Sequence, residues 1–383
     1  MTITAPSADE LRRMMTNQLT AAGALRSEPW IDAFSSIPRH VFVPKFTVRT
    51  QGALHTYDQA DPMWLTAAYR DTSLLTQFDA SGTATSSSTR PSLMATMLGA
   101  LDVEDGHRVM EIGVGTGYNA ALLSHRLGDG QVVSIDVDPE LVSVARQRLQ
   151  EAGYAPTLVA GDGMAGYPAG APYDRLLATC GVGRVPDAWR MQTRPGGVIV
   201  ANIGNGVARL AVDGDHGAEG RFLPELAAFM VARSTPDTVS TTAQQLAGPL
   251  LARTGLKREI TLPTSLSNEV PQFLSSLAGP TVIDFALTDE SGRQVHCLFE
   301  PHTASWARIV LTDARTAQLN HGGPRDLWAE REPLHRHWAS SGQPGPERYG
   351  LTIDTEGTHT LWFDSPTGTS WPLAAPTDHS PQG

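Results

Sequence analysis

Cysteine is almost absent from this chain, with only Cys180 and Cys297 among its 383 residues. So few cysteines argue against a disulfide scaffold and against a cysteine-based metal site, and we expect no bound metal. Long apolar runs are missing as well, since no stretch approaches 18 apolar residues, and no membrane span is expected. The N-terminal segment lacks the apolar stretch of a secretory signal, which makes the cytoplasm the expected location.

Basic residues are also scarce. The chain has 29 Lys and Arg residues against 40 Asp and Glu residues, a formal net charge of −11, and only two of the cations are lysines. This balance offers no broad basic face, so we expect no nucleic-acid partner. Hydrophobic residues make up 40% of the chain, and the length predicts two domains at roughly 100–150 residues each. Nothing in the pattern predicts the oligomeric state.

Strands and helices alternate from residue 107 onward. The strand candidates lie at 107–113, 131–137, 157–162, 173–179 and 198–203, with helix candidates between them. This alternation predicts an α/β fold with a doubly wound parallel sheet. Two further segments, 208–214 and 221–232, are expected to close the sheet as a pair of strands. Upstream, residues 71–92 are expected to form a long polar loop, a kind of segment that is often functional.

The composition changes after residue 232. Residues 234–245 resemble a linker, and one helix is expected at 325–340. Strand candidates lie at 281–287, 295–300, 305–311, 350–354 and 358–364. We therefore predict two domains, the doubly wound domain at 1–232 and a C-terminal α+β extension at 233–383. The last residues, 377–383, are expected to lack fixed structure.

The strongest functional signal is the segment VMEIGVGTGYNAALL, residues 109–123. A buried strand candidate carries Glu111 and runs into Gly113, Gly115 and Gly117, which permit a tight turn and a close approach of a ligand to the backbone. The helix beyond the turn supplies free N–H groups. The spacing G-x-G-x-G differs from the G-x-G-x-x-G of dinucleotide-binding proteins, and this disfavours a dehydrogenase.

Two acidic residues end the next two strand candidates. Asp136 stands where a carboxylate can accept hydrogen bonds from both hydroxyls of a ribose, and Asp162, in the sequence GDG, can accept one from an adenine amino group. Glu111 can serve the ammonium group of a methionine moiety. This set favours S-adenosylmethionine over a dinucleotide. The expected cofactor site comprises Glu111, Gly113, Gly115, Thr116, Gly117, Asp136, Val137, Asp162 and Gly163.

The stretch 107–203 resembles the protein-L-isoaspartate O-methyltransferases, a class I methyltransferase family. The matching segments are VMEIGVGTGYNAALL, VVSIDVDPELVSVAR (132–146), GDG (161–163), APYDRLLAT (171–179) and RPGGVIVANIG (194–204). Upstream, IPRHVFVP (37–44) and AYRDTSLL (68–75) are similar to further segments of the family, and TRPSLMATML (89–98) to its substrate loop. The resemblance implies a Rossmann-like fold, S-adenosylmethionine as methyl donor, and a protein or peptide carboxylate as acceptor.

The resemblance also implies roles in the substrate loop. Ser88 and Thr89 would be the catalytic residues that hold the carboxylate, and Ser87, Arg90 and Ser92 would bind the substrate. Arg90 either pairs with a peptide carboxylate or is a solvated loop residue. No general base is required, because the carboxylate is already ionised at pH 7. The enzyme mainly has to align the reacting atoms.

Four departures from the family concern the substrate. Thr89 stands where the family usually has serine, Arg90 replaces a small or amide residue, the segment between Asp71 and Thr89 is longer, and the C-terminal extension is additional. With these departures the chain resembles the O-methyltransferases of lanthipeptide and graspetide maturation. That likeness implies methylation of an aspartate in a ribosomally made peptide, followed by aspartimide and isoaspartate formation.

The same residues bear on two other functions. The main alternative is a repair methyltransferase that acts on isoaspartyl residues of damaged proteins. A non-catalytic binding protein on the same fold is disfavoured, because Asp136 and the three glycines are all present.

Overall fold

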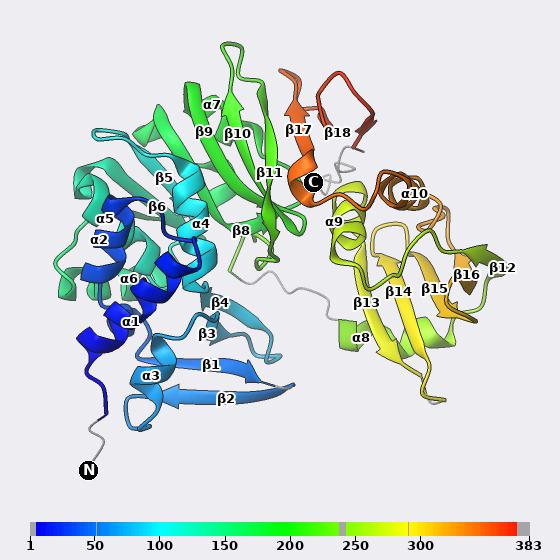
Figure 1. The fold of residues 1–383 in the computed structure, drawn as a ribbon, viewed down its shortest axis with the longest axis horizontal. Coiled ribbons are helices and arrows are strands. Elements are labelled where there is room, and N and C mark those ends of the chain that lie inside the picture. Colours follow the sequence, from blue (N-terminus) through cyan, green and yellow to red (C-terminus); the bar gives the residue numbers. More distant parts are fainter. Residues whose placement is uncertain (1–4, 51, 237–242, 290, 374–383) are drawn as a thin grey trace, which may run out of the picture.

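The computed structural model describes residues 5–50, 52–236, 243–289 and 291–373, and its centre is a sheet of ten strands (Figure 1). The order of the strands is β19-β18-β17-β11-β10-β9-β8-β5-β6-β7. They are β5 (Val109–Ile112), β6 (Val132–Asp136), β7 (Thr157–Ala160), β8 (Tyr173–Val182), β9 (Thr193–Ile203), β10 (Gly206–Val212), β11 (Ala218–Leu226), β17 (Tyr349–Ile353), β18 (His359–Phe363) and β19 (Ser370–Pro372).

The half of the sheet from β7 to β9 is parallel, and the half from β10 to β19 is antiparallel. The parallel half confirms the doubly wound α/β sheet that the alternating pattern predicts. Parallel neighbours are joined by long crossovers that return the chain to the same edge of the sheet. All these strands therefore run in one direction, and their carboxyl ends lie at one edge. The glycine turn after β5 lies at that edge.

Helices cover both faces of the sheet, as parallel strands require. On one face Val109 of β5 packs among residues of α1, α2, α4 and α5, and on the other Met110 packs with residues of α7, α9 and α10. The bounds are α1 (Ala8–Ala21), α2 (Glu28–Ser36), α4 (Pro91–Leu101), α5 (Tyr118–Leu127), α6 (Pro139–Glu151), α7 (Asp187–Gln192), α9 (Glu269–Ala278) and α10 (Glu332–Ser340). Successive residues of one strand thus enter different cores.

A second, four-stranded antiparallel sheet stands beside the carboxyl edge, in the order β2-β1-β3-β4. Its strands are β1 (Lys45–Thr50), β2 (Ala53–Asp58), β3 (Leu74–Phe78) and β4 (Ala84–Ser88), and α3 (Trp64–Ala68) lies between β2 and β3 in the chain. The expectation of a long loop at 71–92 is therefore wrong, since β3 and β4 form a hairpin there. Its turn is closed by Asp79, whose Oδ1 accepts hydrogen bonds from the N–H groups of Ser81 and Thr83 at 2.8 and 2.9 Å.

The C-terminal region divides between two sheets. A five-stranded antiparallel sheet has the order β12-β16-β15-β14-β13, while β17 pairs with β11 and extends the large sheet. The strands at 350–354 and 358–364, expected in the separate extension, thus belong to the large sheet. The bounds in the smaller sheet are β12 (Leu256–Thr261), β13 (Ile283–Thr288), β14 (Gln294–Glu300), β15 (Ser305–Leu311) and β16 (Thr316–Gly322), with α8 (Ala243–Ala252) beside it. The division at residue 232 remains a prediction.

The helix expected at 325–340 is shorter than predicted. It spans only Glu332–Ser340, with Pro333 in its first turn. Proline is tolerated at a helix start but breaks a helix interior, so the helix begins there. The expected tail at 377–383 and part of the expected linker lie outside the described residues.

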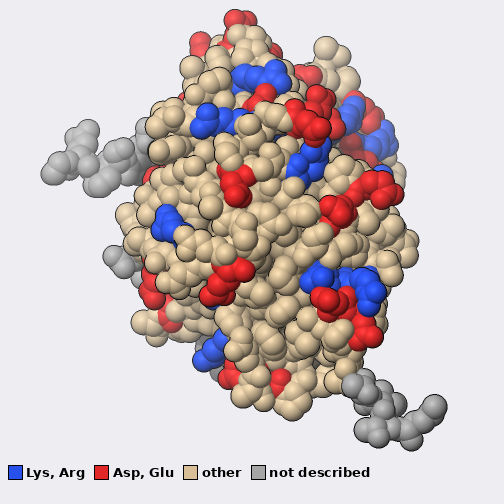
Figure 2. All heavy atoms as spheres, turned by 90° about the vertical axis from the view of Figure 1, so that its left-hand side faces the viewer, with Lys and Arg blue, Asp and Glu red and all other residues tan. Residues whose placement is uncertain are grey.

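Charged side chains are interspersed on the face seen in Figure 2, where acidic and basic groups alternate with uncharged ones. Within the described ranges, no helix is long and apolar enough to cross a membrane. Among the same residues, no three His, Cys, Asp or Glu side chains come together in a group that could hold a metal ion.

Candidate active site

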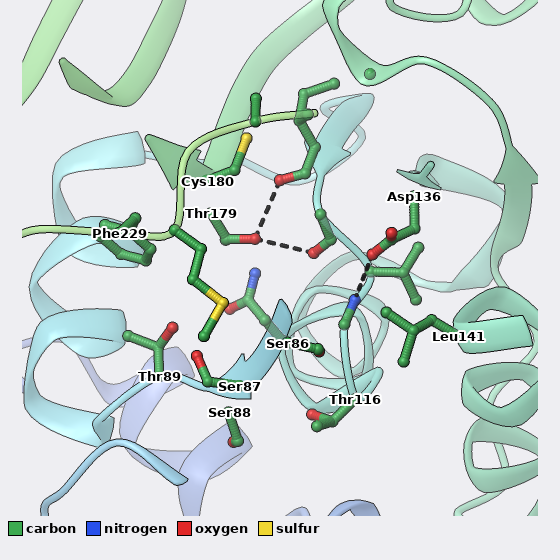
Figure 3. A pocket seen from close by; sticks show the side chains of 18 of the residues that line it. Ser86, Ser87, Ser88, Thr89, Thr116, Asp136, Leu141, Thr179, Cys180 and Phe229 are labelled. Carbon is green, nitrogen blue, oxygen red and sulfur yellow. Dashed lines mark hydrogen bonds between the residues drawn. The ribbon is translucent and has the colours of Figure 1, made fainter. Parts of the chain in front are cut away.

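A pocket lies at the carboxyl edge of the parallel strands, between the glycine turn and the β3–β4 hairpin (Figure 3). Figure 3 shows Ser87 and Thr89 on one side of it and Asp136 and Leu141 on the other. Nine of the predicted site residues line this pocket: Ser87, Ser88, Thr89, Gly113, Gly115, Thr116, Asp136, Val137 and Gly163. The fold therefore unites two motifs, the glycine turn and the hydroxyl-rich loop, which the sequence presents separately.

The glycine turn leaves bare backbone at the pocket wall. Gly113 has a φ of 99°, and a Cβ at this position would lie 2.6 Å from the Oγ1 of Thr179. That oxygen is 3.0 Å from the carbonyl oxygen of Ile112 and 2.9 Å from that of Gly113. Gly115 also has a positive φ, 49°. A side chain at Gly113 would be strained and would clash with Thr179, and the left-handed φ of Gly115 favours glycine.

Asp136 ends β6 and holds the glycine turn in place. Its Oδ2 accepts a hydrogen bond from the N–H of Gly115 at 2.9 Å, and its Oδ1 accepts one from the N–H of Asp138 at 3.2 Å. Burial raises the pKa of Asp136 above its ordinary value, and these two hydrogen bonds counteract the shift in part. The side chain is mostly buried but lines the pocket, so the carboxylate can also accept a hydrogen bond from a ligand.

The hydroxyls of the hairpin are placed by a buried cation that the prediction did not single out. Arg39 lies in the short 3₁₀ helix Arg39–Phe42 and is fully buried. Its Nη2 donates to the carbonyl oxygens of Thr72 at 3.1 Å and Thr89 at 3.2 Å, and its Nη1 to that of Ala68 at 2.9 Å. Burial lowers the pKa of Arg39 to about 10, so the side chain stays charged at pH 7. The only sequence signal for it was the IPRHVFVP segment.

The far wall of the pocket is a segment expected to be a strand. Residues 228–233, here called the strap, leave the sheet after β11 and line the pocket. Gly181 of β8 donates to the carbonyl oxygen of Met230 at 2.8 Å, and its own carbonyl oxygen accepts from Ala232 at 2.8 Å. Asn202 of β9, fully buried, donates to the carbonyl oxygen of Ala227 just before the strap at 2.5 Å, and its Oδ1 accepts from the N–H of Phe229 in the strap at 3.4 Å. The strap is thereby fixed to the ends of two sheet strands.

Cys180 lies next to Thr179 in the pocket wall (Figure 3). Burial raises the pKa of its thiol to about 12. The thiol is therefore protonated at neutral pH and is a weak nucleophile.

Glu111, predicted to hold the cofactor, does not line the pocket. Its side chain is fully buried and accepts a hydrogen bond from the Nδ2 of Asn119 at 2.6 Å and another from the hydroxyl of Ser134. Side chains alternate across a strand, and Glu111 shares the α5-covered face with Val109. Burial raises the pKa of Glu111 to about 7. The structure thus gives it a place under the glycine turn, joining β5, β6 and α5.

Two predicted substrate residues also point elsewhere. Arg90 forms an ion pair with Glu225 of β11, so its guanidinium already has an acidic partner within the chain. The N–H of Ser92 donates to the Oδ1 of Asp71 at 2.8 Å, and this occupies the start of α4. Neither residue lines the pocket. We therefore correct their assignment: both connect the hairpin to its surroundings.

The remaining two predicted residues outside the pocket are capping residues. Gly117 is the N-cap of α5 with a φ of 88°. Asp162 caps the short helix Gly163–Ala165, its Oδ1 accepting from the N–H of Met164 at 2.9 Å. The neighbour Gly163 lines the pocket instead, and its carbonyl oxygen accepts from the indole N–H of Trp189 at 2.8 Å.

A family model described as protein-L-isoaspartate(D-aspartate) O-methyltransferase matches residues 10–222, more than half of the chain. The chain belongs to this family. Its members include the protein-L-isoaspartate O-methyltransferases of Methanopyrus kandleri and Ignicoccus hospitalis. Each is 34% identical over 197 residues, or 51% of this chain, and the matches cover 77% and 82% of those relatives.

A solved structure titled protein-L-isoaspartate O-methyltransferase shares the fold. It superposes with a TM-score of 0.55 at 24% identity, and the match covers 92% of this chain and all of that chain. Coverage of this extent includes most of the C-terminal region.

Membership in the isoaspartate methyltransferase family makes the chain an S-adenosylmethionine-dependent carboxyl O-methyltransferase. The residues of the pocket fit this cofactor. The turn at Gly113 and Gly115 exposes backbone that a ligand can approach closely, and the carboxylate of Asp136 stands at the pocket wall. The class I methyltransferase fold predicted from the sequence is confirmed.

Proposed function

We propose that this enzyme methylates the free carboxylate of isoaspartyl residues in proteins or peptides. One observation carries the proposal: a single pocket combines the hydroxyl-rich hairpin with the glycine turn and Asp136, in a chain whose residues 10–222 match the isoaspartate family. The curated relatives with this name share a third of their residues with the chain over most of their length.

The cofactor side of the pocket would be the turn and the strand ends. Gly113, Gly115, Thr116, Asp136 and Val137 would hold S-adenosylmethionine, with Gly163 at the neighbouring strand end. When bound, this cofactor supplies an activated methyl group. Asp136 would accept the ribose hydroxyls, and it keeps the turn in position through Gly115.

The substrate side would be the hairpin. Ser87 and Thr89 would hold the carboxylate by hydrogen bonding, whereas Ser88 is buried on the same face as Leu74. Arg39 fixes the backbone of Thr89. The carboxylate is ionised at pH 7, so no residue has to remove a proton. The main contribution of the chain is to align donor and acceptor and to limit access of water. The strap and the hairpin form the two walls of the pocket in which donor and acceptor are aligned.

A second candidate substrate is an aspartate side chain in a ribosomally made, modified peptide. Arg90 favours it, because Arg90 replaces the small or amide residue usual at this point of the loop and ties the loop to Glu225. In that case the backbone N–H of the next residue attacks the new ester, methanol leaves, and an aspartimide forms that water opens to isoaspartate. The cytoplasmic location stays a prediction in either case.

Matched peptides distinguish the two substrates. Peptides of one sequence with isoaspartate, with aspartate, or with aspartate inside a macrocycle are incubated with S-adenosylmethionine, and mass spectrometry follows methyl gain and methanol loss. We expect the isoaspartyl peptide alone to gain a methyl group. Methylation of the macrocyclic aspartate, with the isoaspartyl peptide ignored, would replace the proposal by the second candidate. A methyl group on nitrogen or on a hydroxyl would contradict both.

Thr89 provides the matched pair of variants for the same assay. Thr89→Ser keeps the hydroxyl and Thr89→Val removes it at nearly constant volume. A hydrogen bond to a charged group contributes about 1.5–3 kcal/mol, so we expect Thr89→Val to lose about 10- to 150-fold in kcat/KM and Thr89→Ser to remain near wild type. Equal activity of the two variants would show that the Thr89 hydroxyl does not hold the carboxylate.

A further inference from the structure

The pocket continues onto one face of the four-stranded sheet. Ser87 and Leu75, which line the pocket, are directly opposite each other in β4 and β3, and Leu75 is opposite Thr47 in β1. Thr47 in turn faces Thr56 of β2, and their hydroxyl oxygens are 2.8 Å apart. Residues opposite each other across strands share a face. A row of side chains therefore leads from the pocket across the whole sheet to its outer strand.

The other face of this sheet is closed. Phe46, Val48 and Leu74 point into a buried cluster with residues of α3. Since side chains alternate along a strand, the neighbours of Thr47 at positions 45 and 49 return to the pocket-side face. The register of the sheet thus separates an apolar underside from an upper face that is continuous with the pocket.

Two unpaired cations stand on the pocket-side face. Lys45 and Arg49 flank Thr47 on β1, both are exposed, and neither forms an ion pair with any residue that the structure describes. Asp58 is opposite Lys45, but its Oδ1 accepts from the N–H of Ala60 instead. Leu54, opposite Arg49, is 51% exposed. Two cations against one neighbouring carboxylate, that of Asp58, leave this face with a small net positive charge in a chain whose net charge is −11, and an apolar residue stands beside it.

We propose that this face, defined by the exposed side chains of Lys45, Arg49 and Leu54 around the buried Thr47, docks the part of the substrate chain that flanks the methylated residue and selects acidic residues there. The proposal rests on the proposed function, because it takes the carboxylate to lie at Ser87 and Thr89. β1 lies two strands from β4 in the sheet. Strands are about 4.8 Å apart and an extended chain rises about 3.3 Å per residue. The selected acid is therefore about three or four residues from the methylated one.

The test uses isoaspartyl peptides of equal length that carry Glu or Lys three and four residues to either side of the isoaspartate. Methyl transfer from S-adenosylmethionine is measured at low and at high salt. At low salt we expect the wild-type enzyme to have a kcat/KM about five- to tenfold higher for the Glu peptide than for the Lys peptide, because its KM for the Glu peptide is lower. This difference is expected to shrink at high salt, which screens the charges. The KM for S-adenosylmethionine is expected to be the same with both peptides.

Charge-reversed variants assign the effect to this face. The double variant Lys45→Glu with Arg49→Glu is expected to reverse the peptide preference and to leave the KM for S-adenosylmethionine unchanged. Lys257→Glu is the matched control, since Lys257 is the other lysine of the chain and lies exposed on β12 of the five-stranded sheet. It is expected to behave like the wild type.

The outcomes separate this inference from the function on which it rests. Equal kcat/KM for the Glu and Lys peptides, with both methylated, would overturn the docking face alone. Methylation of neither peptide would contradict the proposed function and this inference together. A double variant that alters the sedimentation of the protein while keeping the peptide preference would assign the face to a second copy of the chain and overturn the proposal.

Discussion

Replacing Asp136 tests the placement of the cofactor most directly. Its carboxylate lies at the pocket wall and accepts hydrogen bonds from the N–H groups of Gly115 and Asp138. Asp136→Ala would remove the acceptor for the ribose and also release the glycine turn. A hydrogen bond to a charged group contributes about 1.5–3 kcal/mol, which corresponds to about a 10- to 150-fold increase in the Kd for S-adenosylmethionine.

Two further variants separate the loss of the cofactor contact from a general loss of stability. Asp136→Asn keeps one acceptor oxygen for Gly115, so its loss of affinity is expected to fall below that of Asp136→Ala. Asp138→Ala is the control, because Asp138 lies outside the pocket and its Oδ1 caps α6 through the N–H of Glu140 at 2.9 Å. Loss of a cap costs about 1 kcal/mol of stability and is expected to leave the Kd unchanged.

Calorimetric titration with S-adenosylmethionine measures all three variants. The pH dependence adds an independent check. Because burial raises the pKa of Asp136, the carboxyl group takes up a proton at a higher pH than an ordinary aspartate. The affinity of the wild type is therefore expected to fall as the pH is lowered, while Asp136→Asn shows no such fall. An unchanged Kd in Asp136→Ala would refute the proposed ribose site.

The other predictions concern stability and the pocket walls. The pKa of Glu111 is about 7 against an ordinary value of 4.5, so the folded state binds its proton more tightly, and the free energy of unfolding is expected to drop by about 3 kcal/mol from pH 4.5 to above 7. Glu111→Gln should abolish this drop in denaturant titrations. Asn202→Ala removes the hydrogen bonds that hold the strap, and we expect it to raise the KM for S-adenosylmethionine several-fold with little change in kcat. Val200→Ala is the control, because Val200 is buried on the same strand, and it should lower only the melting temperature. Deletion of residues 235–383 removes β17 and exposes the edge of β11, so light scattering should detect aggregation, and a monodisperse, active truncation would contradict this.

Local patterns were sufficient for the parallel half of the large sheet. The strands around Val109, Val132 and Val198 are short buried runs followed by glycine or acid, and both features are properties of neighbouring residues. The same holds for the turn at Gly113 and Gly115, whose positive φ angles only glycine adopts readily. The position of Asp136 at the pocket follows from topology, since parallel strands bring their carboxyl ends to one edge.

The sequence did not predict the polar strands β3 and β4, nor the pairing of β17 with a strand far away in the chain. β4 is rich in Ser and Thr, and neither β3 (LLTQF) nor β4 (ATSSS) alternates between apolar and polar residues, so the sequence of 71–92 predicts a loop. β17 joins β11 across more than a hundred residues of intervening chain. Strand pairing at such separation depends on the shape of the assembled sheet, which single segments do not encode.

Side-chain direction was the main feature that only the tertiary structure decided. Glu111 was expected to reach the cofactor, but the alternation of β5 turns it toward Asn119 and Ser134. The sequence also offers Arg90 as a substrate ligand, but its partner in the fold is Glu225, 135 residues away in the chain. The sequence by itself determined which residues could carry methyl-transfer chemistry and at which edge of the sheet they gather. Which of them face the pocket was decided by packing, because a buried charge takes the hydrogen-bond partners that the neighbouring elements offer.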